Sequence, residues 1–421
     1  MSVADRSMAI GLFWHHVRCF VARLAFLWEI IKAIVVARLT KRGQLMESEV
    51  EFTTRIDGYY ESGFGALLLN MGSKLGLLDY LIDRRERPVT SETMAEELRL
   101  KERYVREWLD AMVAFHVVET DVENRLYWLP AHRANALSKT GKPELAKLMG
   151  LNCDAGNVMT QWSRFFEMSL GVRAEVEGCF QADGPEGVPC SRYDGLNDVT
   201  VMFGNAKYKD GLLATFVPNL YPQLEGELKS GIRHLDVACG AGTPSHVMAR
   251  AYPQSEFVAV DLDETLLEMA RRKAKEECLS NVDFRLCDAA ALPEEWSASF
   301  DLLTIFSALH DFCYPNKVLL ECLRVLKPGG RLAIVEASVH SNALYNRAFP
   351  LSKMLYGVSL MCCMPQSMSQ PGGKGLGLMA GVERLSKLVV EAGFEVVDCG
   401  VGSLDCAPGD TMILAMKPRE D

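Results

Sequence analysis

Two glycines at alternate positions follow an acid in the stretch LDVACGAGT, Leu235 to Thr243. Gly240 and Gly242 carry no Cβ, so a ligand can lie against the backbone of this turn. A dinucleotide-binding turn has the pattern GxGxxG and holds pyrophosphate at a helix N-terminus. Here the pattern is Asp-x-Ala-x-Gly-x-Gly, and Asp236 would repel a phosphate. The stretch therefore predicts a cationic ligand with an ammonium or sulfonium group.

Ala238 stands where many nucleotide-binding turns carry their first glycine. At the end of a strand its methyl group can pack inward if φ is negative. We therefore expect the turn to keep its function, with an altered fit around the ligand and an altered affinity.

Acids also lie at the ends of the next two predicted strands. Asp261, in VAVDLD, comes about twenty residues after the glycine turn, where a carboxylate accepts both hydroxyls of a ribose. Asp288, in RLCDAAALP, could accept from an adenine amino group, and the Ala289 N–H could face a ring nitrogen. A single aspartate at a strand end is usually a helix cap. Together and in this order, the three strand ends predict a site for a cationic adenosine derivative.

These residues need a parallel sheet to bring them together. After Ile232 the sequence alternates strands and helices, and Pro244 suits the first turn of the first helix. Such alternation predicts an α/β fold, a doubly wound, seven-stranded, Rossmann-like sheet over 229–421. Ligands bind such sheets at the carboxyl ends of the strands.

A mostly helical winged-helix domain is predicted for residues 46–137. Three helical patterns, one with Thr90 as N-cap, precede two short strands around a polar turn at Val122 to Asn124. The third helix could enter DNA, but its acids outnumber Arg103 and Arg106. Packing or dimerisation is the preferred role, because an acidic helix is repelled by phosphates. A helical connector is expected over 138–228.

Composition narrows the classes of partner and site. The chain has 421 residues and a net charge of −10, so a nucleic-acid partner is not expected. Its 13 cysteines are irregularly spaced, without zinc-type pairs, and indicate reduced thiols in a cytoplasmic protein. No metal site is predicted.

The N-terminal segment, 1–45, is predicted to form an amphipathic helix with a narrow polar stripe. Scattered charges interrupt the apolar part, 8–39, and its longest uncharged stretch is too short to span a bilayer. Docking on the rest of the protein, contact with a membrane surface and a mitochondrial presequence stay open as its role.

The motifs DVACGAG, VAVDLD, LCDAAALP, FDLLTIFSALHDF and LKPGGRLAIVE resemble those of class I S-adenosylmethionine-dependent methyltransferases, over about Gly231 to Lys417. The resemblance implies that S-adenosylmethionine is the cofactor. It implies cofactor-binding roles for Asp236, Ala238, Gly240, Gly242, Asp261, Leu262, Asp288, Ala289 and Phe306. Leu262 would pack on the adenine, and Phe306 would border the reacting methyl group. The winged-helix unit resembles the N-terminal domain of small-molecule methyltransferases, which dimerises and helps close the substrate site.

Methyl transfer is an in-line attack on a sulfonium methyl, and its leaving group is neutral. A general base is needed only when the nucleophile arrives protonated. His310, in SALHDF just past the fourth strand, is the candidate, and Asp311 beside it could orient the ring. The alternative is a histidine that caps or fills the loop.

An insert between Ser338 and Gly381 separates the fifth strand from the next helix. Its methionines and aromatic residues are followed by a glycine-rich, hinge-like end. It is expected to form a lid over an apolar pocket, or a helix that packs on the winged-helix unit.

The sequence thus predicts S-adenosylmethionine-dependent methyl transfer to a small, partly apolar molecule. The alternative is a winged-helix regulator or scaffold that binds the cofactor without turnover. Methylation of RNA, DNA or protein lacks support, since no NPPY-like signature is present.

Overall fold

The computed structural model describes residues 47–121, 125–138, 158–209, 211–221, 223–349, 351–400 and 410–419. The chain divides into two compact units. One comprises Glu47–Glu177 and Cys190–Gly211, and the other contains Gly178–Pro189 and Leu212–Asp421. The predicted connector, 138–228, has described residues in both units, and the predicted domain boundaries stay predictions.

The predicted N-terminal helix, 1–45, and the membrane contact considered for 8–39 lie outside the described residues. Within the described ranges, no helix is both long and apolar enough to cross a membrane.

Among the described residues, a seven-stranded sheet forms the centre of the larger unit, in the order β6-β5-β4-β7-β8-β10-β9. Its strands are β4 (Arg233–Val237), β5 (Glu256–Asp261), β6 (Val282–Leu286), β7 (Phe300–Phe306), β8 (Leu326–Ala337), β9 (Glu395–Gly400) and β10 (Asp410–Met416). The strands β4 to β8 pair in parallel, whereas β10 is antiparallel to both of its neighbours. The predicted doubly wound sheet is confirmed.

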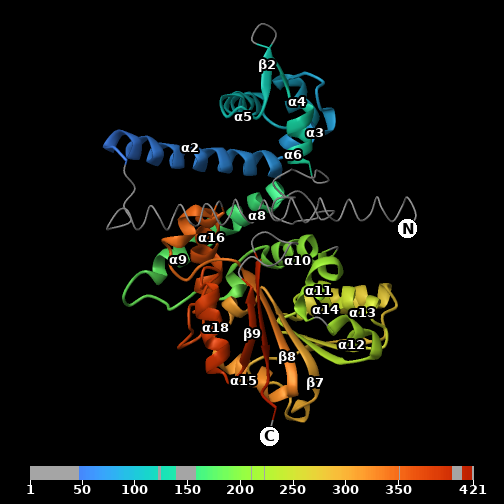
Figure 1. Cartoon of the computed structure of the whole chain (residues 1–421). Coiled ribbons are helices and arrows are strands. Elements are labelled where there is room, and N and C mark those ends of the chain that lie inside the picture. The colour runs from blue at the N-terminus through green and yellow to red at the C-terminus, as the bar shows by residue number, and fades with distance from the viewer. Residues whose placement is uncertain are drawn as a thin grey trace, which may run out of the picture. The chain divides into compact units, whose positions relative to one another are not determined.

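Helices cover both faces of this sheet because its strands are apolar on both sides. Figure 1 shows α13 (Thr243–Ala251) and α14 (Glu264–Glu276) on one side, and α15 (Pro315–Val325) and α18 (Val382–Glu391) on the other. One core contains strand residues such as Ile305 with Val389 of α18, and the other contains Phe284 with Ala270 of α14. Because β4 to β8 run in parallel, their carboxyl ends lie at one edge of the sheet, where the predicted site residues also lie.

Shorter helices complete the larger unit. They are η2 (Leu212–Phe216), α11 (Val217–Leu220), α12 (Leu224–Ser230), η3 (Glu294–Trp296), η4 (Leu309–Asp311), η5 (Tyr345–Ala348), α16 (Ser352–Val358), η6 (Ser359–Cys363) and α17 (Met364–Ser367). The last four belong to the predicted insert.

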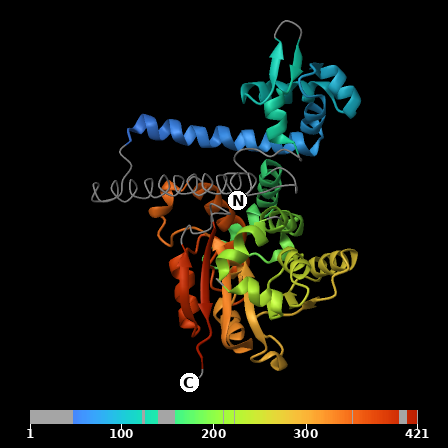
Figure 2. The ribbon, with the colours of Figure 1, turned by 45° about the vertical axis from the view of Figure 1, so that its right-hand side comes forward.

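The smaller unit has the predicted winged-helix architecture. Its helices are α2 (Glu49–Lys74), α3 (Leu77–Arg84), α4 (Ser91–Leu98), α5 (Glu102–Ala114), α6 (Ala131–Leu137), α8 (Val158–Gly171), the greater part of α9 (Arg173–Cys179), η1 (Cys190–Arg192) and α10 (Leu196–Tyr208). Its strands, β1 (Val89–Thr90), β2 (Glu119–Asp121) and β3 (Leu126–Trp128), pair antiparallel, and β2 and β3 form the wing seen in Figure 2.

Local contacts explain how the smaller unit is built. The Thr90 hydroxyl accepts from the Thr93 N–H at 3.2 Å, which confirms the predicted N-cap of α4. The Trp108 indole of α5 donates to Leu68 O of α2 at 2.8 Å. A Cβ at Gly72 would come within 2.2 Å of the Trp108 ring, so this glycine lets α2 pass close to α5.

Candidate active site

The turn from β4 to α13 is held by its neighbour β5. The Cys239 N–H donates to Val260 O at 3.0 Å, and the Gly240 N–H donates to Asp261 Oδ2 at 2.7 Å. Gly242 is the N-cap of α13, and Pro244 lies in the first turn, as predicted. The turn and the second strand-end acid therefore form one connected structure.

Ala238 corrects an expectation about this turn. Its φ is 59°, in the left-handed region, and not negative as we expected. The backbone there bends as a glycine would, so the alanine bears a strain of about 1–2 kcal/mol. Ser307, just past β7, also has a positive φ of 52°. Strained backbone at the ends of two adjacent strands is typical of functional sites.

Gly242 meets a different neighbour from the one predicted. A Cβ at this position would lie 2.4 Å from Phe284 Cε1 and 3.2 Å from Ala270 Cβ. The absent side chain therefore makes room for packing between α13, β6 and α14. This role corresponds to close helix–strand packing and not to the approach of a ligand.

Asp236 lies in a buried polar network that the sequence did not reveal. The Ser245 hydroxyl donates to its Oδ2 at 2.7 Å, and the Thr304 hydroxyl donates to its Oδ1 at 3.2 Å. His234 Nε2 lies 2.9 Å from the Thr304 hydroxyl. Burial raises the pKa of Asp236 to about 7 and lowers the pKa of His234 to about 3. A nearby cation would stabilise the Asp236 carboxylate, which accords with the predicted charge of the ligand.

Asp261 ends β5 as predicted. Its Oδ1 accepts from the Asp263 N–H at 2.9 Å, while Oδ2 accepts from Gly240. Burial raises the pKa of this carboxyl. The next residue, Leu262, exposes 69% of its surface, which leaves an apolar side chain available to a flat ligand. Asp263 caps α14, so the helix-cap role falls to Asp263.

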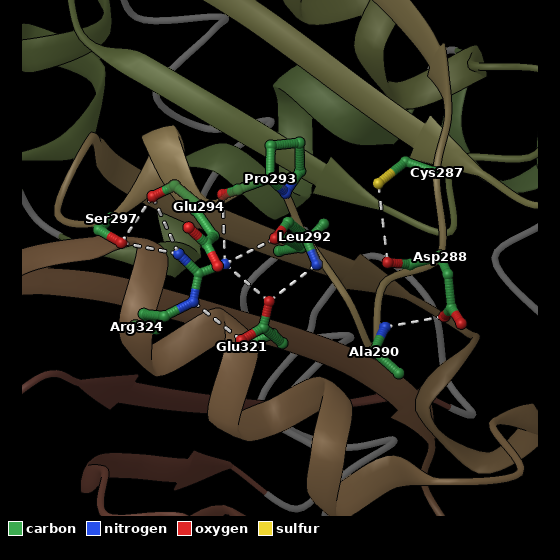
Figure 3. A network of polar contacts seen from close by, with 9 residues as sticks. All are labelled: Cys287, Asp288, Ala290, Leu292, Pro293, Glu294, Ser297, Glu321 and Arg324. Carbon is green, nitrogen blue, oxygen red and sulfur yellow. Dashed lines mark hydrogen bonds and ion pairs between the residues drawn. The ribbon is translucent and has the colours of Figure 1, made fainter.

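The loop after β6 carries the predicted adenine-reading residues. Asp288 is exposed, and its Oδ1 accepts from the Ala290 N–H at 2.8 Å, whereas Ala289 is buried. Figure 3 shows what holds the rest of this loop. Glu321 Oε2 accepts from the Leu292 N–H at 2.8 Å, and Arg324 donates to Leu292 O at 2.8 Å.

The Arg324 guanidinium connects α15 to η3 as well. It donates to Ser297 Oγ at 2.7 Å and makes two hydrogen bonds with Glu321, at 2.7 and 2.8 Å. These contacts lower the pKa of Glu321, chiefly through the hydrogen bond from Arg324. The pair thus holds the backbone N–H and the carbonyl of Leu292 against α15.

His310 is buried on η4, just past β7. Its Nδ1 lies 2.5 Å from Glu336 Oε2, and its backbone N–H donates to Glu336 Oε1 at 3.3 Å. A carboxylate at Nδ1 requires the proton there, so the neutral ring presents the Nε2 lone pair. Asp311 Oδ1 lies 3.4 Å from Nε2. Glu336 was missed by the sequence analysis, although an acid that ends the apolar run RLAIVE was a visible signal.

The predicted insert packs against the loop that carries His310. The Gly377 N–H donates to His310 O at 3.1 Å, and the Lys374 N–H donates to Cys313 O at 3.0 Å. A Cβ at Gly377 would come within 2.6 Å of Ser359 Oγ. The glycine-rich end is therefore closely packed over this loop. At the end of β7, the Phe306 ring packs edge-on against the Phe216 ring of η2, with the ring centroids 6.4 Å apart.

The residues at this edge fit S-adenosylmethionine. A buried acid behind the glycine turn favours a positive charge, the second strand-end acid has the place of a ribose acceptor, and an exposed leucine follows it.

Comparisons with known proteins agree with this fit. Residues 228–371 match a family described as "Methyltransferase domain", and residues 63–139 match the "Rv2258c-like winged HTH domain". A demethylmenaquinone methyltransferase of Clavibacter sepedonicus is 34% identical over 171 residues, 40% of this chain and 68% of the relative. One of Lactococcus lactis is 37% identical over 123 residues, 29% of this chain, and the match spans only 48% of that relative.

Solved structures of other proteins share this fold. An O-methyltransferase family protein from Burkholderia thailandensis matches with a TM-score of 0.58 and 16% identity, over 90% of this chain and all of that one. At this identity the likeness shows the fold, which includes both units. The chain therefore belongs to the S-adenosylmethionine-dependent methyltransferases that act on small molecules, with a winged-helix domain ahead of the methyltransferase domain.

Proposed function

We propose that this methyltransferase acts on a hydroxyl group of a small, partly apolar molecule, with His310 as the general base. One observation carries the proposal: the buried contact of 2.5 Å between His310 Nδ1 and Glu336 Oε2. A carbon nucleophile that arrives as an anion needs no base. A hydroxyl gains from one, because its oxygen becomes nucleophilic as the proton leaves.

Glu336 acts as the positioning residue for this base. Its two oxygens accept from the ring and from the backbone N–H of the same histidine, so the ring is held in one orientation. When Nε2 takes the proton of the substrate hydroxyl, the carboxylate stabilises the imidazolium that forms. Burial of both side chains strengthens this electrostatic interaction.

The strand-end residues are proposed to hold the cofactor. S-adenosylmethionine supplies the methyl group on a cationic sulfur. Asp236, Ala238, Gly240 and Gly242 form the turn beside its methionine part, with Asp236 acting through charge and through the order of the turn. Asp261 binds the ribose, Leu262 packs on the adenine, and Asp288 with Ala289 reads the adenine edge. Phe306 borders the methyl group.

The insert is proposed as the cover of the acceptor pocket. Its support is the contact of Gly377 and Lys374 with the loop of His310 and Cys313. Half-buried apolar residues of the insert, such as Met354 and Met361, suit a partly apolar acceptor. The names of the bacterial relatives make hydroxylated quinol rings a sensible part of an acceptor panel.

The test compares His310→Gln and Glu336→Gln with the unchanged protein. Methyl transfer from labelled S-adenosylmethionine to a panel of phenols and quinols is measured, together with calorimetric cofactor affinity. We expect His310→Gln to lose about 10²–10⁴ in kcat, the usual contribution of a general base, with unchanged cofactor affinity. Glu336→Gln should lose less. Near-normal turnover of His310→Gln would exclude the base role.

We propose further that the smaller unit forms a homodimer through α2. Its support is a set of exposed apolar side chains on this helix, including Tyr60 at 71% and Phe64 at 63%. Large exposed apolar groups on one helix are typical of an association surface. A cytoplasmic location and a membrane contact through 8–39 stay predictions.

A further inference from the structure

Three metal-binding side chains of different types meet at the proposed base, and the base itself, His310, is one of them. One ligand atom from each of His310, Asp311 and Cys363 lies within 4.8 Å of the other two. His310 and Asp311 are neighbours on η4, whereas Cys363 is the last residue of η6 in the insert. The fold, and not the sequence spacing, assembles this set.

The distances suit a tetrahedral ion. Nε2 and Oδ1 are 3.4 Å apart. Two ligand atoms at about 2.0–2.1 Å from a tetrahedral metal lie about 3.3–3.4 Å from each other. A thiolate at about 2.3 Å would lie about 3.6 Å from each of them, so each separation that involves Sγ needs to shorten by about 1 Å or less. A rotation of the side chain provides such a shift.

The surroundings of the three ligands also match a metal site. Glu336 holds the opposite ring nitrogen of His310 at 2.5 Å, the carboxylate–histidine arrangement that orients metal-bound imidazoles. Asp311 Oδ1 is shielded from solvent, and the Asp311 carboxylate interacts with the Cys363 thiol, so two of the three ligands already contact each other. The Asp311 side chain as a whole exposes 41% of its surface, which gives an ion a route from solvent.

We propose that His310, Asp311 and Cys363 bind a divalent cation of the zinc class. One nitrogen, one oxygen and one thiolate form a three-ligand site, and its fourth position stays open to water or another donor. The Cys363 thiol releases its proton to solvent when the ion binds. The ion takes the Nε2 lone pair, so a metal-loaded His310 cannot act as a base. Zinc therefore inhibits methyl transfer.

The binding part of this inference stands on its own, whereas the inhibition rests on the base role proposed above. Cobalt(II) is the probe for binding, because a thiolate ligand gives it a near-ultraviolet charge-transfer band and four-coordination gives strong visible bands. The full-length, reduced, metal-free protein is titrated under anaerobic conditions. We expect one equivalent to give both signals, and zinc to displace them.

Variants decide whether these residues are the ligands. Cys363→Ser should lose the charge-transfer band, and Asp311→Asn should bind at least tenfold more weakly with the band retained. Cys313→Ser is the matched control, a nearby half-buried thiol outside the set, and should titrate like the unchanged protein. Circular dichroism and S-adenosylmethionine binding verify that each variant is folded. A band that survives in Cys363→Ser, or no band in the unchanged protein, overturns the proposal.

Activity gives the second readout. Zinc should reduce turnover of the unchanged protein reversibly, and a chelator should restore it. Relative to the zinc-free rate of each variant, Cys363→Ser should need at least tenfold more zinc for the same loss, whereas Cys313→Ser should not. Cobalt binding without zinc inhibition would keep the metal site and reject His310 as the base. Zinc that raises turnover would overturn the inhibition.

Discussion

At the scale of single residues, the site combines strain with buried charge. Ala238 has a left-handed backbone, and the Asp236 carboxyl has an environment that disfavours its charge. Both cost folding free energy, and both lie where the cofactor is proposed to bind. A protein retains such features when the free energy of ligand binding offsets their cost.

The strain at Ala238 gives a prediction about stability. Ala238→Gly relieves a left-handed backbone strain of about 1–2 kcal/mol. The greater conformational freedom of glycine in the unfolded chain offsets about 0.5–1 kcal/mol of this gain in stability. We expect a net gain of up to about 1.5 kcal/mol in the free energy of unfolding, measured by urea denaturation. Ala249→Gly, inside α13, is the control and should destabilise by about 1 kcal/mol. A destabilised Ala238→Gly would contradict the strain argument.

The buried Asp236 gives a prediction about pH. Its pKa is raised from 3.8 to about 7, and Ser245, Thr304 and Asp261 are the groups that act on it besides burial. Because the cationic cofactor favours the carboxylate, binding below about pH 7 must release a proton. We expect cofactor affinity to fall by up to about tenfold for each pH unit below 7. Asp236→Asn should flatten this slope in calorimetry, leaving only the part due to Asp261, whose pKa is also raised by burial.

The same carboxyl has the opposite effect on the stability of the free protein. A folded pKa above the unfolded value stabilises the protein fully below about pH 4 and loses this contribution as the pH rises through about 7. Asp236→Asn should remove that loss between these two values in thermal unfolding. The exposed Asp283→Asn is the control and should change neither slope. Equal slopes in Asp236→Asn and the unchanged protein would exclude a titrating Asp236.

At the scale of elements, α15 holds the loop after β6 that is proposed to read the adenine, here called the adenine loop. Arg324 and Glu321 hold the N–H and the carbonyl of Leu292, four residues after Asp288 (Figure 3). Arg324→Gln removes the hydrogen bond to Leu292 O and leaves Glu321 with one partner fewer. We expect the Kd for S-adenosylmethionine to rise about tenfold, the effect of one or two hydrogen bonds, with kcat at saturating cofactor nearly unchanged.

The control for this prediction is Arg272→Gln, an exposed arginine on α14 outside the network. It should leave the Kd as it is. A lower kcat in Arg324→Gln, with the Kd unchanged, would mean that the pair of Arg324 and Glu321 serves the reacting groups and not the adenine loop.

The elements also show what the sequence could predict. The strands, α13 and the strand-end acids followed from apolar runs and spacing, because parallel strands must end at one edge. The acid in RLAIVE was visible, but the contacts of Glu336 and Cys363 with His310 could not be assigned, since they join different elements that meet only in the folded sheet and insert. The left-handed φ of Ala238 was missed because an alanine gives no sign of it.

At the scale of the whole molecule, the charges on α5 disfavour DNA binding by the winged-helix unit. On α5, Arg106 pairs with Glu102 at 3.2 Å, and Arg103 pairs with Glu107. Each arginine of the helix that would enter the major groove is therefore neutralised by an acid one turn away. This agrees with the net charge of −10 and leaves association between protein chains as the expected role.

The homodimer gives the prediction at this scale. A Phe64→Asp, Tyr60→Asp double variant places two carboxylates on the exposed apolar surface of α2, where burial in an interface would strip them of water. We expect the unchanged chain to sediment as a dimer and the double variant as a monomer, with the cofactor affinity of the larger unit retained.

Glu61→Gln, on the same helix but already polar and exposed, is the control and should leave the dimer intact. A double variant that still sediments as a dimer would place the interface elsewhere. An unchanged chain that sediments as a monomer would overturn the homodimer.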